Sequence, residues 1–489
     1  MRVQQNLQQR YKAILHDVGL ILIVGGSLML APLFVSVRGE RAGFLVPAAC
    51  LLLFGGALWL FVPRKNGEPI TVQEGGAIVL VSWVLICLFS AWPFAAILKL
   101  HLTQAVFESV SGWTTTGLSV IDVTKASPAI LLWRSIMQLA GGAGLAIMML
   151  AAILGPVGPA LSIAEGRTEQ LVPHVRESAR LVMFLYGGYA IAGVPAYMLA
   201  GMGWFDAVNH AFAAISTGGF STKPESIGYW NSVAIEAVSI PLMLLGNLNF
   251  YTAYLLMHGR FRAALRNGEV HLTAVLLPLC VLVLFFFVCA GVYSTLTKSV
   301  RVAVFETVTA LTTTGFSTVA YNEWKPMGWL VLIVLMLIGG GTGSTAGGIK
   351  QYRVFVLFKS VLWEVRRSLL PRTAVVQDYI WQGERKDFIT EERIRKIGTF
   401  VFLYLLVYVA GAAVIAAHGH GLRESLFEYA SALGTVGLSV GVTGAQTPPT
   451  ILWAEIAGMF LGRLEFFVII ISLVKITRDM NTLVRAAKP

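Results

Sequence analysis

The chain has 489 residues, of which 56% are hydrophobic and only 13% are charged, and its mean hydropathy is +0.72. This apolar share is well above that of soluble globular domains, so the composition excludes a soluble enzyme or binding module. The formal net charge of +11 is spread over the loops between apolar stretches, which argues against a nucleic-acid partner. We therefore expect an integral membrane protein.

Apolar stretches follow one another along the chain. A helix needs about 20 apolar residues to cross a bilayer, and ten stretches have roughly this length. They lie at 17–37, 43–62, 76–98, 129–154, 181–200, 232–257, 272–294, 328–349, 398–417 and 450–474. If the N-terminus is cytoplasmic, most of the 37 Lys and Arg residues lie in inner loops, as the positive-inside rule requires. The sequence predicts an all-α, multi-pass protein with a cytoplasmic N-terminus.

A short polar motif occurs four times between these stretches. The copies are AVFESVSGWTTTGLSV (105–120), AVNHAFAAISTGGFST (207–222), AVFETVTALTTTGFST (303–318) and SLFEYASALGTVGLSV (425–440). Three columns are invariant: a threonine, a glycine two residues later and a serine two residues after that. We call the first of these the threonine column, which consists of Thr115, Thr217, Thr313 and Thr435. The domain-sized spacing indicates four internal repeats and not a solenoid.

Each copy has a long apolar span before it, begins with a short lead-in that cannot cross a membrane, and is followed by a second long span. We expect a helix, a half-crossing helix, a re-entrant loop and a second helix, four times over and in parallel orientation. The predicted domains are an N-terminal helix pair (1–65) and four pore repeats (66–165, 166–268, 269–390 and 391–489). Non-helical backbone at membrane depth survives only where it faces protein or a water-filled path. The four loops are therefore expected to meet around a pseudo-fourfold axis.

Loops that converge on one axis can direct carbonyl oxygens at a cation and replace the hydration shell of potassium. Glycine permits the backbone conformations that this needs, and threonine adds a hydroxyl ligand. A half-crossing helix also points the negative end of its dipole at the cation. The predicted ion-binding residues are Thr115, Thr116, Gly117, Leu118, Thr217, Gly218, Gly219, Phe220, Thr313, Thr314, Gly315, Phe316, Thr435, Val436, Gly437 and Leu438.

Three of the half-crossing helices carry a glutamate in the same column, namely Glu108, Glu306 and Glu428, and the second has Asn209-His210 there. These carboxylates either bind nearby backbone amides and brace the loop, which we favour, or draw cations to the pore. No HExxH pattern and no nucleophile elbow are present, so an enzyme is not expected.

The last stretch of the third repeat is interrupted by six glycines within 339–348. Each costs about 1 kcal/mol in a helix relative to alanine, so 339–349 is expected to unwind into an intramembrane gating loop. Arg463 has the corresponding depth in the fourth repeat, where its charge would repel a cation that has passed the filter; the alternative is a bracing pair with Glu465 or another carboxylate. Arg134, at the outer end of its span, is expected to be an anchor or ion-pair partner. The predicted gate residues are Gly341, Thr342, Gly343, Ser344, Thr345 and Arg463.

These motifs resemble a known family. Thr435-Val436-Gly437-Leu438 resembles the core of potassium-channel filters, and the four repeats resemble the Trk/Ktr/HKT superfamily of potassium and sodium transporters, most closely its bacterial TrkH/TrkG branch. The supporting stretches are WRSIMQLAGGAG (133–144), GNLNF (246–250), GGGTGSTAGGIKQYR (339–353) and GRLEFF (462–467).

The resemblance implies potassium uptake across a bacterial cytoplasmic (inner) membrane by a homodimer in which each protomer has its own pore. It also implies gating by a soluble, nucleotide-binding TrkA-type subunit, for which the basic inner loop 350–397 is a docking candidate, unless its charge reflects topology alone. Potassium ions are then the only bound group expected on this chain, besides membrane lipid. A sodium-permeable or poorly selective cation channel, or an alternating-access cation symporter, is the alternative.

Overall fold

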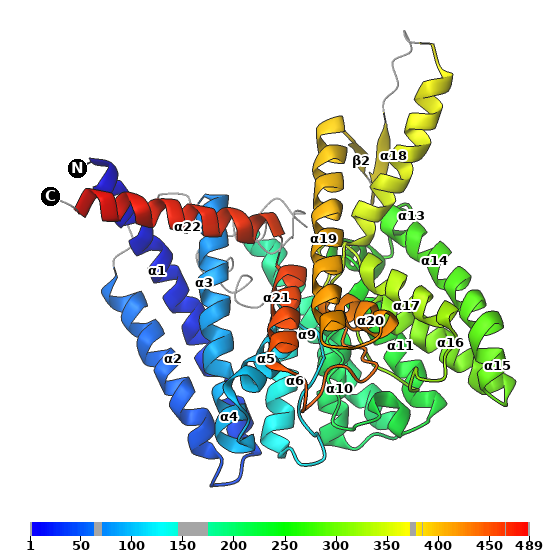
Figure 1. Cartoon of the computed structure of the whole chain (residues 1–489), viewed down its shortest axis with the longest axis horizontal. Helices are drawn as coiled ribbons and strands as arrows, with labels where there is room; N and C mark the ends of the chain where they lie inside the picture. The colour runs from blue at the N-terminus through cyan, green and yellow to red at the C-terminus, as the bar shows by residue number, and fades with distance from the viewer. Residues whose placement is uncertain are drawn as a thin grey trace.

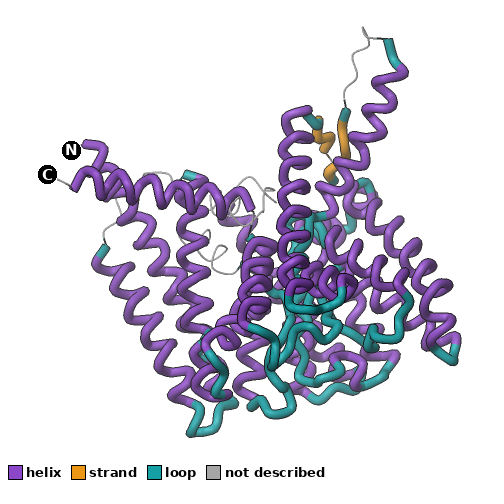
Figure 2. Tube along the Cα trace, viewed as in Figure 1, coloured by secondary structure: helices purple, strands orange, loops and turns teal. Residues whose placement is uncertain are grey.

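The computed structural model describes residues 2–62, 71–144, 175–371, 378–383, 385–464 and 466–487. This part of the chain is mostly helical, with one small two-stranded sheet (Figure 2). Six of its helices are long and apolar enough to cross a membrane, or eight if each of two bent helix pairs is one span. The chain is therefore a multi-pass membrane protein, as the composition predicts.

The first two helices, α1 (Arg2–Leu28) and α2 (Arg41–Phe61), pack along each other at one side of the molecule (Figure 1). They approach closely at two glycines. A Cβ added to Gly19 would lie 2.7 Å from the carbonyl oxygen of Gly55, and a Cβ on Gly55 would lie 2.7 Å from that of Gly19. Small residues at a crossing let two backbones come into contact, which favours helix association in lipid.

In four later parts of the chain a short helix lies between longer ones. The first part has α3 (Val72–Ser90), α4 (Trp92–Leu98), the short α5 (Leu102–Trp113) and α6 (Pro128–Ala143). The second has α9 (Val175–Leu199), the short α10 (Trp204–Ile215) and α11 (Val233–Asn247). The third has α14 (Gly268–Leu284), α15 (Ala290–Val292), the short α16 (Leu296–Leu311) and α17 (Pro326–Ile338). The fourth has α19 (Glu391–Ala417), the short α20 (Leu422–Leu433) and α21 (Pro449–Arg463).

The short helices lie inside the bundle. Every residue of α5 from Ala105 to Trp113 is buried, including the charged Glu108. Trp113 packs edge-to-face against Trp83 of α3 and Trp133 of α6, with ring centroids 6.4 Å apart in both pairs. Such aromatic pairs contribute about 0.5–1.5 kcal/mol beyond their buried area. The bundle therefore holds each short helix by its flanking long helices.

Two of the predicted spans are wrong as single straight helices. The stretch 232–257 is divided into α11 and α12 (Phe250–Met257), which are bent by 115°. The side chain of Asn249 caps α12 by accepting a hydrogen bond from the Tyr251 N–H over 2.8 Å, and so starts a new helix at the break. The stretch 450–474 is divided into α21 and α22 (Phe466–Ala487), bent by 104°. In Figure 1 α22 lies across the ends of α1 and α3, and both helices contact it.

The all-α assignment also needs a correction, because β1 (Tyr379–Gln382) and β2 (Arg385–Phe388) form an antiparallel hairpin. Aromatic and β-branched residues fill β1, which favours a strand. Gly383 starts the turn with a φ of 59°. The region 350–397 is likewise not a loop, since α18 (Gln351–Leu369) occupies its first half. In Figure 1 α18 and the hairpin extend beyond the helix bundle.

The remaining short elements are α13 (Phe261–Leu265), two 3-10 turns at Ala31–Phe34 and Ser226–Tyr229, and a π turn at Phe285–Cys289. Parts of the predicted boundaries lie outside the described residues. These are the end of the span 129–154, the predicted domain boundaries 65/66 and 165/166, and the residue Glu465.

Candidate functional site

The four short helices end in the same way at the repeated motif. The N–H of the invariant threonine donates to the carbonyl three residues earlier, and the next N–H donates to the carbonyl five residues earlier. This is the Schellman arrangement, in which the donor of the first of these two bonds, here the threonine, has a left-handed backbone. The φ values of the threonine column are 56° for Thr115, 51° for Thr217, 54° for Thr313 and 51° for Thr435.

Threonine is an unusual residue for this conformation. Helices normally place glycine there, because a β-branched side chain is sterically disfavoured at positive φ. A residue held in such a region costs about 1–3 kcal/mol and persists only where its surroundings fix it. All four side chains are fully buried, and the hydroxyls of Thr115 and Thr435 have no hydrogen-bond partner among the described residues. These two hydroxyls are therefore available to a ligand.

The glycines of the four loops bring the loops into a closed ring. Their φ values are 92° for Gly117, 70° for Gly219, 82° for Gly315 and 96° for Gly437. A Cβ added to any of them would collide with a carbonyl oxygen of another loop. These oxygens belong, in the same order, to Gly218, Thr314, Val436 and Thr116. The contacts thus run from the first loop to the fourth and back to the first.

Buried carboxylates brace the outer ends of three loops. Glu108 accepts a hydrogen bond from the Val120 N–H over 3.1 Å. Glu306 accepts from the Thr318 N–H over 2.9 Å. Glu428 accepts from two amides, those of Val440 and Thr443, over 3.0 and 2.9 Å. Carboxylates that accept backbone hydrogen bonds hold a turn in place, so these contacts favour bracing over cation attraction.

The second loop has a different brace, because a histidine stands in the glutamate column. The Nδ1 of His210 lies 2.8 Å from the carbonyl oxygen of Asp206, so this nitrogen donates. Its Nε2 lies 3.0 Å from the hydroxyl oxygen of Ser221. In the first and fourth loops the carboxylates of Glu108 and Glu428 contact the equivalent serines, Ser119 and Ser439.

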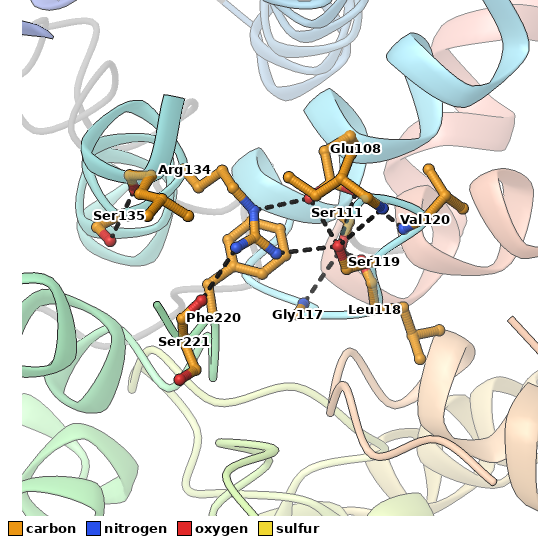
Figure 3. A network of polar contacts seen from close by, with 12 residues as sticks. Glu108, Ser111, Gly117, Leu118, Ser119, Val120, Arg134, Ser135, Phe220 and Ser221 are labelled. Carbon is orange, nitrogen blue, oxygen red and sulfur yellow. Dashed lines mark hydrogen bonds and ion pairs between the residues drawn. The ribbon is translucent and has the colours of Figure 1, made fainter. Parts of the chain in front are cut away.

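Arg134 of α6 links the first and second loops (Figure 3). Its Nε donates to Glu108 over 2.7 Å, and both side chains are buried. One terminal nitrogen donates to the Ser119 hydroxyl over 3.0 Å and the other to the Ser221 carbonyl over 3.1 Å. The guanidinium also stacks on the Phe220 ring, 3.7 Å from its centroid. Arg134 is therefore an ion-pair partner, as predicted.

Another loop, 339–350, which follows α17, lies at the threonine end of the ring. α17 ends at Ile338, where the glycines were expected to end it. The hydroxyl oxygens of Thr345 and Thr217 lie 3.2 Å apart. The Gly347 N–H donates to the hydroxyl of Thr313 over 2.8 Å. The predicted gate residues 341–345 therefore lie in a loop that directly contacts the threonine column.

Arg463 fixes this loop from the opposite side. Its guanidinium donates to the carbonyl of Thr345 over 2.5 Å, to that of Gly141 over 2.7 Å and to that of Gly142 over 3.1 Å. Glu269 holds the other part of the loop by accepting from the Thr342 N–H over 2.6 Å. Arg463 thus joins three segments that are far apart in the sequence.

A cavity of about 720 Å³ opens at the glycine end of the ring. All four ring glycines line it, together with charged side chains of both signs, including Arg134 and Asp122. Asp122 is exposed in the loop between α5 and α6, and a hydrogen bond from the Thr124 hydroxyl, followed by one from Lys125, holds its pKa below the ordinary value. The cavity therefore presents an ionised carboxylate at neutral pH.

Comparisons with known proteins assign this arrangement to a family. Residues 44–483 match the family described as "TrkH: Cation transport protein". The chain belongs to the TrkH family. It is 31% identical to the Trk system potassium uptake protein TrkH of Escherichia coli strain K12, over 94% of this chain and 98% of the relative. It is 28% identical to an uncharacterized cation transporter of Methanocaldococcus jannaschii, over 94% of both chains. The crystal structure of the potassium transporter TrkH from Vibrio parahaemolyticus superposes with a TM-score of 0.82 at 28% identity, covering 94% of this chain and 98% of that one.

Membership of the TrkH family confirms the resemblance inferred from the repeated motifs. The sequence pattern identified the threonines and glycines of the ring as site residues but left two features of the ring unpredicted. It attributed special backbone geometry to the glycines, whereas the threonines also have positive φ. The contacts of two residues from other segments were also not predicted: the side chain of Gln138 in α6 donates to the Gly218 carbonyl, and the main-chain carbonyl of Asn247 in α11 accepts from the Gly341 N–H. A buried polar residue within an apolar stretch was the available signal for both.

Proposed function

We propose that the chain takes up potassium through a selectivity filter formed by the four loops. The observation that carries this is the closed ring of loop carbonyls with the threonine column at one end. Carbonyl oxygens with added hydroxyls can replace the hydration shell of potassium. The relative from Escherichia coli is named as a potassium uptake protein, and a glycine in all four loops favours potassium over sodium. The path runs from the cavity of about 720 Å³, through the ring, to the loop 339–350.

The loop 341–347 and Arg463 form the gate in this proposal. The loop contacts Thr217 and Thr313 at the end of the path, so a cation cannot leave the ring until the loop moves. Hydrogen bonds from Arg463 to carbonyls of two segments hold it there. Its release is assigned to a cytoplasmic, nucleotide-binding TrkA-type subunit, with nucleotide on that subunit alone.

The cellular setting follows from the same proposal. The protein is a homodimer in a bacterial cytoplasmic membrane, with a cytoplasmic N-terminus and one pore in each protomer. The regulatory subunit docks on the region 350–397. Within it Arg367 is tied to Asp378 over 2.7 Å and to Glu391 over 3.1 Å, whereas the adjacent Arg366 is exposed. Arg366 is therefore the better docking residue of the two.

The function is tested by transport. Expression in a strain without potassium uptake systems is expected to restore growth at low potassium. Proteoliposomes that contain the purified protein together with its regulatory subunit should accumulate rubidium far faster than sodium, with no requirement for a proton or sodium gradient. Equal rates for the two ions would show a poorly selective channel, and dependence on a proton or sodium gradient would show an alternating-access symporter. Either result would contradict the proposal.

A further inference from the structure

The residue after the invariant threonine distinguishes the second loop from the others. It is Thr116, Thr314 or Val436 in three loops and Gly218 in the second. In the first and third loops its hydroxyl oxygen lies 2.8 Å from that of the threonine two residues earlier. The second loop has no side chain at this position and cannot brace itself in this way.

Gln138 of α6 reaches this position from outside the loop. Its Nε2 donates to the Gly218 carbonyl over 2.5 Å, and its Oε1 accepts from the Phe220 N–H over 3.1 Å. Both partners are main-chain groups, one of which only accepts and the other only donates, so the orientation of the amide is fixed. Gln138 is fully buried, where an unbonded amide would be unfavourable.

The glutamine also explains why residue 218 is glycine. A Cβ added to Gly218 would collide with the side-chain amide of Gln138. Gly218 itself does not have a positive φ, so its backbone would accept another residue. The exclusion therefore comes from Gln138, which fills the space at this position of the loop.

The hydrogen bond from Gln138 falls on a carbonyl of the ring. The Gly218 oxygen is the atom that faces Gly117 of the first loop. A carbonyl oxygen has two lone pairs, so it can accept from Gln138 and still face a cation. One turn earlier on α6, Arg134 donates to the Ser221 carbonyl and stacks on Phe220. Side chains of α6 thus hold the second loop at both ends.

We propose that Gln138 is a positioning residue for selectivity, which holds the Gly218 carbonyl in the ring in place of a side chain of the loop itself. This rests on the proposed function of the four loops as a filter. The fourth loop has Val436, which has no hydroxyl, and no external amide of the described residues reaches this position, so the proposal concerns the second loop alone.

The test is the ratio of rubidium-86 to sodium-22 uptake into potassium-loaded proteoliposomes. Gln138→Ala is expected to lower this ratio by about tenfold, the effect of a net loss comparable to one hydrogen bond. Gln138→Glu, which is nearly isosteric but cannot donate from an ionised carboxylate, is expected to lower it at least as much. If the alanine variant folds poorly, the glutamate variant gives the same test.

Gln104 provides a matched control, because its amide also bridges two main-chain groups. It donates to the Ala445 carbonyl over 2.8 Å and accepts from the His101 N–H over 3.3 Å, outside the ring. Gln104→Ala is expected to keep the wild-type ratio. Gly218→Thr should lower the ratio because of the collision, and the double variant Gln138→Ala/Gly218→Thr should regain part of it because the threonine fills the vacated space.

The outcomes separate the two proposals. If Gly315→Ser lowers the ratio but both Gln138 variants keep it, the filter stands and Gln138 only packs. If the uptake ratio of the double variant is no higher than the effects of the two single changes multiplied together, the idea that Gln138 replaces a side chain of the loop is wrong. If Gly315→Ser also leaves the ratio unchanged, the filter assignment fails together with the role of Gln138.

Discussion

The ring is made of residues whose backbone or burial is unfavourable on its own. Four buried threonines have positive φ, and four glycines leave no room for a Cβ against a neighbouring carbonyl. Such strain is retained only when the surrounding structure fixes it. Here the Schellman bonds fix the threonines and the neighbouring loops fix the glycines. The geometry of each loop therefore depends on the other three.

Gly315→Ser tests this dependence. The side chain would meet the Val436 carbonyl at a φ of 82°, so we expect the rubidium-over-sodium uptake ratio to fall while the protein still folds. Gly419→Ser is the control, because Gly419 has a φ of 92° but nothing within 4 Å of an added Cβ. A wild-type ratio in Gly315→Ser, or an equal fall in the control, would contradict the role assigned to the ring.

The buried pair Glu108–Arg134 gives a second prediction for single residues. Glu108→Gln leaves a buried guanidinium without a charged partner, so we expect the free energy of unfolding in detergent to fall by about 3 kcal/mol. Glu236→Gln is the matched control, because it also breaks an arginine–glutamate pair. Its partner is Arg301, whose side chain is 19% exposed to solvent. Equal losses in the two variants would mean that burial does not make the first pair special.

The residues of the ring were only partly predictable. The invariant columns identify the threonines and glycines because the four repeats of the chain can be aligned with one another. Gln138 could not be found in this way, because it lies in α6 and contacts the loop of the next repeat across 80 residues of sequence. No periodicity links such positions, and only the packing of α6 on α10 brings them together.

Among the secondary-structure elements, the breaks between helices matter most for the proposed function. The loop after α17 was predictable because six glycines destabilise a helix. The bends after α11 and α21 were not predicted, because an apolar stretch resumes directly after the few polar residues at each break. Their causes are local: Asn249 caps a new helix, and Leu464 takes an extended backbone directly after Arg463 binds three carbonyls.

Arg463 gives the prediction for these elements. Arg463→Ala removes the donor from the Thr345, Gly141 and Gly142 carbonyls and frees the loop 341–347. Hydrogen bonds to a charged group contribute about 1.5–3 kcal/mol each, so we expect rubidium flux without the regulatory subunit to rise by about tenfold. Arg423→Ala, which breaks an exposed ion pair with Glu424, should leave flux unchanged. Flux that falls or stays level in Arg463→Ala, with normal expression, would place the gate elsewhere.

For the whole molecule, hydropathy predicted the class and six of the spans as straight helices, but not the bent helix pairs or the part outside the bundle. α18 is not apolar enough along its length to cross a membrane, and with the hairpin it extends beyond the other helices (Figure 1). Yet one side of it is apolar and exposed. This stripe consists of Phe358, Val361, Leu362, Val365 and Leu369. The residues recur at helical spacing on one face, which is the pattern of a helix that packs against another protein surface.

We assign this stripe to the contact between the two protomers of the proposed homodimer. Leu369 is 82% exposed and Phe358 63%, a cost in water that a second copy of α18 would remove. Val361→Glu and Val365→Glu are therefore expected to convert the dimer into a monomer, measured by light scattering in detergent. Ser360→Glu adds the same charge on the opposite face of α18 and should leave the dimer intact. If both valine variants remain dimeric but no longer bind a TrkA-type subunit, the stripe belongs to the regulator instead; if neither property changes, it serves neither contact.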